Sequence, residues 1–353
     1  MNKKIEETIQ KITPVNFEMM EKAGDKLDNL TKPRGSLGKL EDFARRMVGI
    51  TETLNPVIKR KVIFVMAGDH GVTEEKVSAY PQEVTFQMVY NFIREGAGIN
   101  VLAKHIGAEV IIVDMGVASE FPSDKGIIIK KISYGTKNMA IGPAMSREEA
   151  ENAVISGIEV FEDEWDKEKI DIIGLGEMGI GNTTASSAIV SCLTKSDAEM
   201  VTGSGTGIKK EQLKHKIQVI KRALEVNKPD FKDGLDVLSK VGGFEIGGLA
   251  GCILAAASHR TPIVIDGFIS AASALIALNL SPEVADYIFT SHNSVEKGHE
   301  VALKYIGKVP MFDLKMRLGE GTGAALGISF IEAGVKILTR MATFSDAKVT
   351  KKI

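Results

Sequence analysis

Five short apolar segments, each followed by a polar or glycine-rich turn, constrain the fold of this chain most strongly. Little apolar–polar alternation occurs within them, and most lead into a segment with helical spacing. Buried strands of parallel sheets have this pattern because helices cover both faces of such sheets. We therefore predict an α/β fold, with strands in Lys61–Met66, Glu109–Val113, Ile170–Gly174, Pro262–Ile265 and Asp286–Phe289 and a weaker candidate in Gly126–Ile129.

Polar side chains stand directly after several of these predicted strands. They are Asp69 with His70, Asp114, Asp266, and Ser291 with His292. Open α/β sheets bind ligands outside the carboxyl ends of their strands, so this edge is the expected site. A structural role is equally open for each aspartate, because aspartate often caps the turn that follows it.

Both ends of the chain have a helical pattern. Apolar residues recur at helical spacing within residues 1–55 and again within 324–342, and the breaker-rich turn KPRGSLG separates the first helices at residues 32–38. We expect residues 1–55 and 324–353 to form a small helical domain. The large α/β domain, residues 56–323, would then carry the active site.

Composition excludes several classes of function. A formal net charge of −2 provides no basic surface for nucleic acid, and no apolar run of about 18 residues lacks a charge, so we expect no membrane span. Cys192 and Cys252 lie in apolar runs and are expected to be buried thiols, and the six histidines show no zinc-type spacing with them. The charged N-terminus lacks an apolar signal core, which favours the cytoplasm.

The most informative segment for chemistry is Met316–Ala325, in which Glu320 stands between two glycines ahead of an apolar helical pattern. Glycines let a backbone approach a ligand closely, and a helix N-terminus offers free N–H groups to an anion. A glutamate adds negative charge there, so the segment suggests a site that binds an anionic substrate and also accepts a proton. The alternative is a helix-start loop whose Glu interacts with the helix dipole.

A second glycine-rich loop, Gly174–Thr184, joins a predicted strand to a predicted helix and suits a phosphate group. Its first six residues also match G-x-G-x-x-G, which leaves a dinucleotide-binding oxidoreductase as a competing hypothesis. In that motif the acidic residue about 20 positions on should end a second strand. Here Asp197 lies in a polar turn after a helical pattern, which disfavours the dinucleotide hypothesis.

A third glycine loop, Thr202–Gly207, precedes a helical pattern in which Lys214 or Lys216 could reach a phosphate. Three such loops favour one shared nucleotide site. The chain contains neither a G-x-S-x-G nucleophile elbow nor a P-loop, which disfavours a serine hydrolase and a P-loop ATPase.

Taken together, these motifs resemble the nicotinate-nucleotide:dimethylbenzimidazole phosphoribosyltransferases along nearly the whole chain. The segments that carry the resemblance are Lys32–Gly38, Ala67–Val72, Pro81–Thr85, Val113–Val117, Gly176–Thr184, Gly242–Ile246, Ile265–Phe268, Ser291–His292 and Arg317–Gly323. The chain departs from the family pattern at Ser204 and Lys209. That departure affects the contacts of one loop and not the reaction.

The resemblance implies a reaction and an assembly. The phosphoribosyl group of nicotinate mononucleotide would move to 5,6-dimethylbenzimidazole, giving α-ribazole 5′-phosphate and nicotinate with inversion at C1′. No cofactor is expected, and no metal, because no pyrophosphate leaves. A Rossmann-like sheet, a small helical domain and a homodimer are implied as well.

The resemblance also implies roles for individual residues. Glu320 would be the catalytic base, with Glu177 at the reacting centre. The mononucleotide would be bound by Gly176, Gly179, Ile180, Gly181, Asn182, Thr183, Gly205, Lys216, Asp266 and Ser294. The benzimidazole would be bound by Ser78, Tyr80, Gln87 and Leu318.

The chemistry agrees with these roles, since a carboxylate that removes the benzimidazole N–H proton makes the other ring nitrogen a better nucleophile. Two alternatives stay open. A non-catalytic nucleotide-binding module would need the glycine loops but not the two glutamates, and an NAD-dependent oxidoreductase would bind a nicotinamide cofactor.

Overall fold

The computed structural model describes residues 1–122, 126–205 and 207–350. Within them, six parallel strands form one sheet in the order β3-β2-β1-β4-β5-β6. This order reverses between β1 and β4, which is the switch point where such sheets bind ligands. The predicted parallel α/β fold is confirmed, including the weaker strand. The strands are β1 (Lys61–Gly68), β2 (Glu109–Gly116), β3 (Ile128–Ile129), β4 (Ile172–Met178), β5 (Ile263–Ile265) and β6 (Ile288–Thr290).

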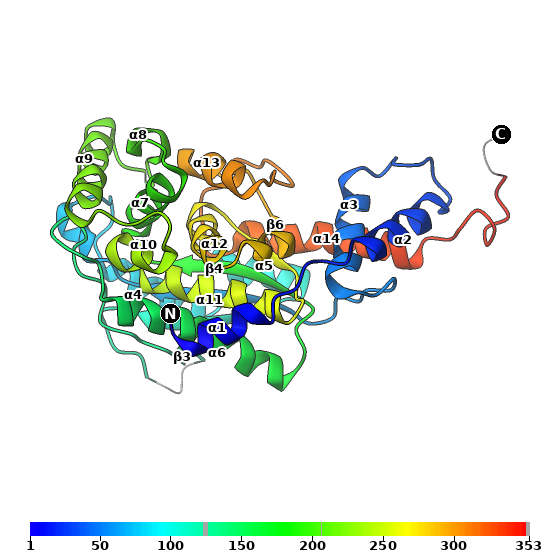
Figure 1. Ribbon diagram of the computed structural model, residues 1–353, viewed down its shortest axis with the longest axis horizontal. Coiled ribbons are helices and arrows are strands. Elements are labelled where there is room, and N and C mark those ends of the chain that lie inside the picture. Colours follow the sequence, from blue (N-terminus) through cyan, green and yellow to red (C-terminus); the bar gives the residue numbers. More distant parts are fainter. Residues whose placement is uncertain (123–125, 206, 351–353) are drawn as a thin grey trace.

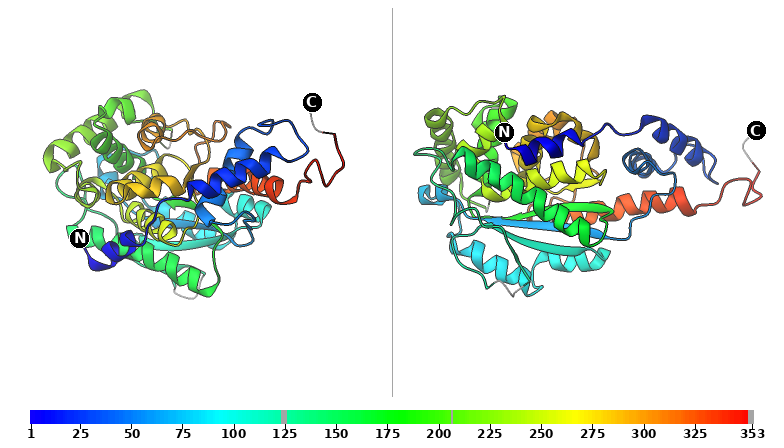
Figure 2. Two further views of the ribbon diagram at one scale, coloured as in Figure 1. Left: turned by 45° about the vertical axis from the view of Figure 1, so that its right-hand side comes forward. Right: turned by 60° about the horizontal axis from the view of Figure 1, so that its bottom comes forward.

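Helices cover both faces of the sheet (Figures 1 and 2). On one face α11 (Phe244–Ser258) and α12 (Phe268–Leu280) pack together and against the strands, and on the other α5 (Gly98–Ile106) packs beside α14 (Thr322–Arg340). Every residue of β1 is therefore buried, which explains the unbroken apolar runs in the sequence. The remaining helices of this part are α4 (Glu83–Ile93), α6 (Arg147–Lys167), α7 (Asn182–Thr194), α8 (Ala198–Val201), α9 (Lys210–Asn227), α10 (Gly234–Val241), α13 (Lys297–Ile306) and the 3-10 turns Gly71–Glu75 and Pro282–Tyr287.

Strand β4 differs from the prediction at its carboxyl end. We expected a long glycine loop to begin at Gly174, but the strand continues through Glu177 to Met178. The physical reason is close packing, because a Cβ on Gly176 would lie 2.2 Å from the carbonyl oxygen of Glu320. The first glycines thus allow another segment to cross the strand, and the loop begins only at Gly179.

Two terminal helices and the end of α14 lie together, away from the sheet (Figure 1). Helices α2 (Phe17–Asp28) and α3 (Lys39–Thr51) share a small apolar core with the last turns of α14. Gly334 lets α14 cross α3 closely, since a Cβ there would lie 2.4 Å from the Leu40 carbonyl oxygen.

Helix α1 (Lys3–Gln10) instead packs on α6 and α11 of the large part, and the first turns of α14 pack on β4. Residues 351–353 lie outside the described residues. The domain boundaries at residues 55 and 324 stay a prediction.

Helix α14 is long and apolar enough to cross a membrane, alone among the helices of the described residues. Of its most apolar window, 56% is buried inside the protein. A core helix of a globular domain passes the same test of length and composition, so this property is weak evidence for a membrane span.

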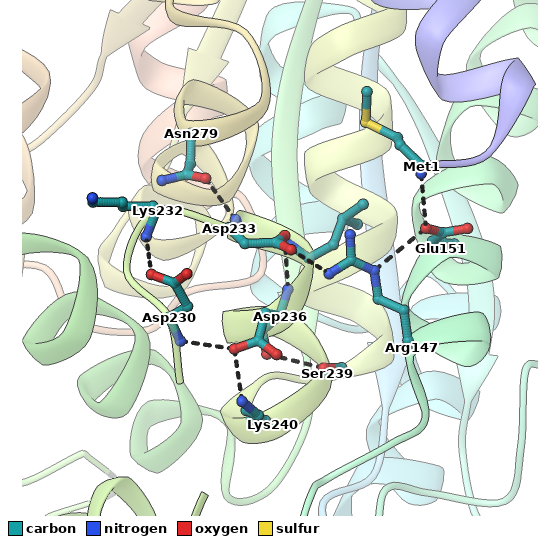
Figure 3. Close-up of polar contacts among 12 residues, drawn as sticks. Met1, Arg147, Glu151, Asp230, Lys232, Asp233, Asp236, Ser239, Lys240 and Asn279 are labelled. Carbon is teal, nitrogen blue, oxygen red and sulfur yellow. Dashed lines mark hydrogen bonds and ion pairs between the residues drawn. The ribbon is translucent and has the colours of Figure 1, made fainter. Parts of the chain in front are cut away.

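A charged network joins α6 to the segment around α10 (Figure 3). Arg147 contacts Asp233 at 2.7 Å and Glu151 at 3.3 Å, and Glu151 also faces the N-terminal amine at 3.9 Å. These groups are partly exposed, so each pair adds little to stability, but together they tie the chain terminus to the outer helices.

Candidate active site

A cleft of about 940 Å³ opens at the carboxyl ends of β4 and β5. Eleven of the residues predicted for the site line it, including both catalytic candidates. They are Tyr80, Glu177, Gly179, Ile180, Asn182, Thr183, Gly205, Asp266, Ser294, Leu318 and Glu320. Gly176, Gly181 and Lys216 lie immediately behind the lining, whereas Ser78 and Gln87 are not part of it.

Glu320 lies in a strained turn at the centre of the cleft. Its φ is +62°, and Gly319 and Gly321 on either side also have positive φ, at +83° and +90°. A non-glycine residue in this region costs about 1 kcal/mol or more. Several other such residues of this chain end helices, whereas Glu320 stands in a turn that lines the cleft. Glu320 is 5% exposed, and its carboxylate accepts a hydrogen bond from the Ile99 N–H at 3.2 Å, at the N-terminus of α5.

Burial raises the pKa of Glu320, and backbone N–H groups of Ile99 and Gly98 oppose that rise. The helix N-terminus therefore keeps this buried carboxylate able to ionise. A base in this environment has a pKa closer to neutrality than an exposed glutamate, which suits proton transfer.

Glu177 ends β4 directly beside this turn. Asn182 donates a hydrogen bond to its carboxylate, and a Cβ on Gly319 would lie 2.4 Å from its Oε1. Burial and then the nearby charge of Asp266 raise the pKa of Glu177 to about 8, against smaller lowering effects of Asn182 and the Glu320 backbone. Glu177 is therefore mostly a neutral acid near pH 7.

Asp266 has a role that the sequence left open. Its carboxylate accepts hydrogen bonds from the backbone N–H groups of Gly321 at 3.2 Å, Gly323 at 2.6 Å and Ala324 at 3.1 Å. It thus caps the N-terminus of α14 and holds the Glu320 turn in place. Burial raises its pKa to about 7 despite these donors.

The opposite end of the cleft has donors suited to a phosphate. Lys216 on α9 is 1% exposed, and its Nζ donates to the Thr183 hydroxyl at 2.8 Å. A Cβ on Gly205 would lie 3.0 Å from that Nζ, so the glycine leaves space beside the ammonium. Burial lowers the pKa of Lys216 to about 8.

The N-terminus of α7 is directed toward the same region. Gly181, with φ of +99°, turns the chain into this helix, and no side chain caps it. The N–H groups of Asn182 and Thr184 donate to the Gly179 and Gly181 carbonyls, so the anion would be favoured here by the helix dipole of α7, the Thr183 N–H and the Lys216 ammonium.

The wall beside Glu320 is apolar. Val84 and Met88 of α4 and Val101 and Leu102 of α5 line it, with Leu318 at the rim. Val84 lies in the segment 78–87, which the family resemblance assigns to the benzimidazole pocket. Met88, Val101 and Leu102 were not predicted, because they look like ordinary core positions of amphipathic helices. Arg317 and Glu296 also line the cleft and were not predicted, although Arg317 is the first residue of the quoted R-L-G-E-G-T-G motif.

Among the described residues, no group of three or more histidine, cysteine, aspartate or glutamate side chains is arranged to hold a metal ion. The free cysteines lie away from this cleft, with Cys252 buried on α11 and Cys192 partly buried on α7.

Comparison with known proteins identifies the family. A family model described as "Phosphoribosyltransferase" matches residues 12–349. Proteins named nicotinate-nucleotide–dimethylbenzimidazole phosphoribosyltransferase from Geobacter sulfurreducens and Desulforudis audaxviator are each 56% identical to this chain and align with 98% of it, covering 98% and 97% of their own lengths.

A crystal structure of the protein of that name from Thermus thermophilus superposes with a TM-score of 0.90 at 40% identity, over 96% of this chain and 100% of that one. The chain therefore belongs to the nicotinate-nucleotide–dimethylbenzimidazole phosphoribosyltransferase family.

Proposed function

We propose that this protein transfers the phosphoribosyl group of nicotinate mononucleotide to 5,6-dimethylbenzimidazole. The products are nicotinate and α-ribazole 5′-phosphate, with inversion at C1′, as a step in making the lower ligand of cobalamin. The observation that carries this proposal is the position of Glu320, a buried carboxylate between an apolar wall and a phosphate-type end of one cleft. Membership of the family supports it independently.

The phosphate of the mononucleotide would bind at the Lys216 end. Lys216, Thr183 and the N-terminus of α7 supply charge and hydrogen bonds there, and Gly205 leaves room. The backbone of Gly179 and Ile180 would lie along the ribose, and Ser294 would line the cleft on the other side of the mononucleotide. In this proposal Gly176 and Asp266 act through the Glu320 turn that they hold.

The benzimidazole would lie against the apolar wall. Burial of flat hydrocarbon against Val84, Met88 and Leu102 favours a planar aromatic acceptor over water. Leu318 and Tyr80 border the same space, and Ser78 and Gln87 stay predictions for its outer edge.

The chemistry follows from these positions. As one benzimidazole nitrogen attacks C1′, Glu320 removes the proton from the other nitrogen. The C1′–N bond to nicotinate breaks, and its electron pair neutralises the departing pyridinium. Positive charge on the pyridinium and then on the ribose favours ionisation of the neighbouring Glu177 carboxyl, and the carboxylate so formed would stabilise that positive charge during the step.

We also propose a cytoplasmic homodimer. Large apolar side chains are exposed along a flank formed by α14 and the segment before it, among them Leu314, Leu318 and Phe330, which are 60%, 59% and 43% exposed. A second copy of the chain would cover such a flank.

The proposal is tested by incubating purified protein with nicotinate mononucleotide and dimethylbenzimidazole and separating the products by chromatography. Equimolar nicotinate and α-ribazole 5′-phosphate are expected. Protein that binds the mononucleotide but forms no product with a benzimidazole would support a non-catalytic nucleotide-binding module instead.

A further inference from the structure

A buried pair of ionisable side chains, His70 and Glu245, lies behind the cleft and has no role in the reaction described so far. His70 follows β1, and its Nε2 lies 2.7 Å from Oε1 of Glu245 in the first turn of α11. The two side chains are 1% and 0% exposed. The N-terminus of α11 favours the negative charge of Glu245.

The imidazole of His70 lies directly under the loop Gly179–Gly181, which lines the cleft. A Cβ on Gly179 would lie 3.4 Å from His70 Nε2, and one on Gly181 would lie 3.2 Å from His70 Cβ. On the other side of the ring, a Cβ on Gly243 would lie 2.4 Å from Cε1. The ring therefore fills the space that Gly243 leaves and lies against the start of the loop at Gly179, so a shift of the ring toward the loop would displace it.

Thr85 holds the same loop from a different direction. Its hydroxyl accepts a hydrogen bond from the Ile180 N–H at 3.0 Å, and its side chain is also hydrogen-bonded to Asp69, the neighbour of His70. The Gly179–Gly181 loop is thus fixed by the uncharged Thr85 hydroxyl and by the charged His70–Glu245 pair. Variants of the two can therefore separate the effect of loop position on activity from the effect of charge on activity.

The pair also lies within electrostatic reach of Glu177. Glu177 faces Asp266, Asn182, the Glu320 backbone and Glu245, and the charge of Glu245 raises its pKa. Burial opposes charging of His70, but Glu245 and Asp69, the charged groups that face it, outweigh burial and raise the pKa of the imidazole. The positive charge of protonated His70 therefore offsets the effect that the negative charge of Glu245 has on the pKa of Glu177.

We infer that His70 and Glu245 are positioning residues for the phosphoribosyl transfer: the pair fixes the Gly179–Gly181 loop beneath the mononucleotide and balances charge behind Glu177. The inference rests on the proposed function. A pair that only stabilised the fold would change the melting temperature and leave the ionisation of the active site untouched.

Three variants test the inference. Glu245→Gln keeps an acceptor for His70 but removes a negative charge, so the ionisation assigned to Glu177 in the pH profile of kcat/KM should move to lower pH. His70→Gln leaves Glu245 unbalanced and should move it to higher pH. Thr85→Val changes no formal charge. It is expected to raise the KM for nicotinate mononucleotide, to lower kcat/KM by up to ~10² through misplacement of the loop, and to move the pH profile less than either charge variant, because it reaches His70 only through Asp69.

Shifts in the same direction, or no shift, in the two charge variants would overturn the charge-balancing role. A second measurement covers positioning independently of turnover. Hydrogen exchange at the Ile180 amide should speed up in His70→Gln and in Thr85→Val, and unchanged exchange in His70→Gln would overturn that role. If wild-type protein transfers no phosphoribose, the proposed function fails, while this exchange experiment and the affinity for the mononucleotide still decide the positioning role.

Discussion

Replacing Glu177 with glutamine should stabilise the folded protein, and increasingly so as the pH rises. The side chain is 8% exposed, and its burial, followed by the charge of the neighbouring Asp266, raises its pKa from 4.5 to about 8. A carboxyl group whose pKa is higher in the folded state binds its proton more tightly there. Stability is therefore greatest below pH 4.5 and is lost as the pH rises through about 8.

The size of the effect follows from the same shift. Each pKa unit corresponds to about 1.4 kcal/mol, so ionised Glu177 costs the folded state about 5 kcal/mol in total, of which about 2 kcal/mol appears between pH 6 and pH 8. Glutamine resembles the neutral acid in shape and keeps an oxygen for the Asn182 donor. Removing the Glu177 charge also lets Asp266 ionise more easily in the folded protein, which further stabilises the variant relative to wild type as the pH rises.

Urea unfolding of wild type and Glu177→Gln at pH 6 and pH 8 measures this. The free energy of unfolding of the variant relative to wild type should grow by about 2 kcal/mol between these two pH values, while transfer activity falls. A variant that is less stable than wild type at both pH values, by a constant amount, would refute the reasoning.

Three further substitutions follow from the site. Gly176→Ala should destabilise the protein by about 1–3 kcal/mol in urea unfolding and lower kcat, because its Cβ would lie 2.2 Å from the Glu320 carbonyl oxygen; wild-type values would contradict the close approach. Lys216→Met should raise the KM for nicotinate mononucleotide ~10-fold or more, and wild-type affinity should fall above pH 8, because burial lowers the pKa of Lys216 to about 8; calorimetry that detects neither change would exclude the phosphate role. Leu318→Ala should raise the KM for dimethylbenzimidazole and change stability by less than about 0.5 kcal/mol, since Leu318 is 59% exposed; an unchanged KM would place the acceptor elsewhere.

Short-range patterns made the sheet predictable. Each strand combines an apolar run with a turn, and both signals lie within about ten residues, so all six strands were found from sequence. Gly174 and Gly176 of β4 were misassigned to a loop, because the segments whose close packing requires glycine there lie elsewhere in the chain. Gly176 permits the approach of Glu320, which is 144 positions away in sequence, and no local pattern encodes that contact.

The polar half of the cleft was predictable for the same reason, whereas only part of the apolar half, Leu318 and the segment 78–87, was predicted. Glycine loops with Asn182, Thr183 and Glu320 are unusual in sequence and so point to function. Met88 and Val101 have the spacing of any amphipathic helix, and only the folded chain brings them beside Glu320. The three backbone contacts of Asp266 show that it caps α14, which its position after a strand could not reveal, and its role in binding the mononucleotide stays a prediction.

The central claim is that Glu320 is the base of a phosphoribosyl transfer in this cleft. The most direct test measures kcat of wild type and Glu320→Gln with nicotinate mononucleotide and dimethylbenzimidazole, following nicotinate and α-ribazole 5′-phosphate together and checking the melting temperature of both proteins. We expect the variant to fold and to bind the mononucleotide, and its kcat to fall by ~10² or more. A folded variant that forms α-ribazole 5′-phosphate at nearly the wild-type rate would contradict the account.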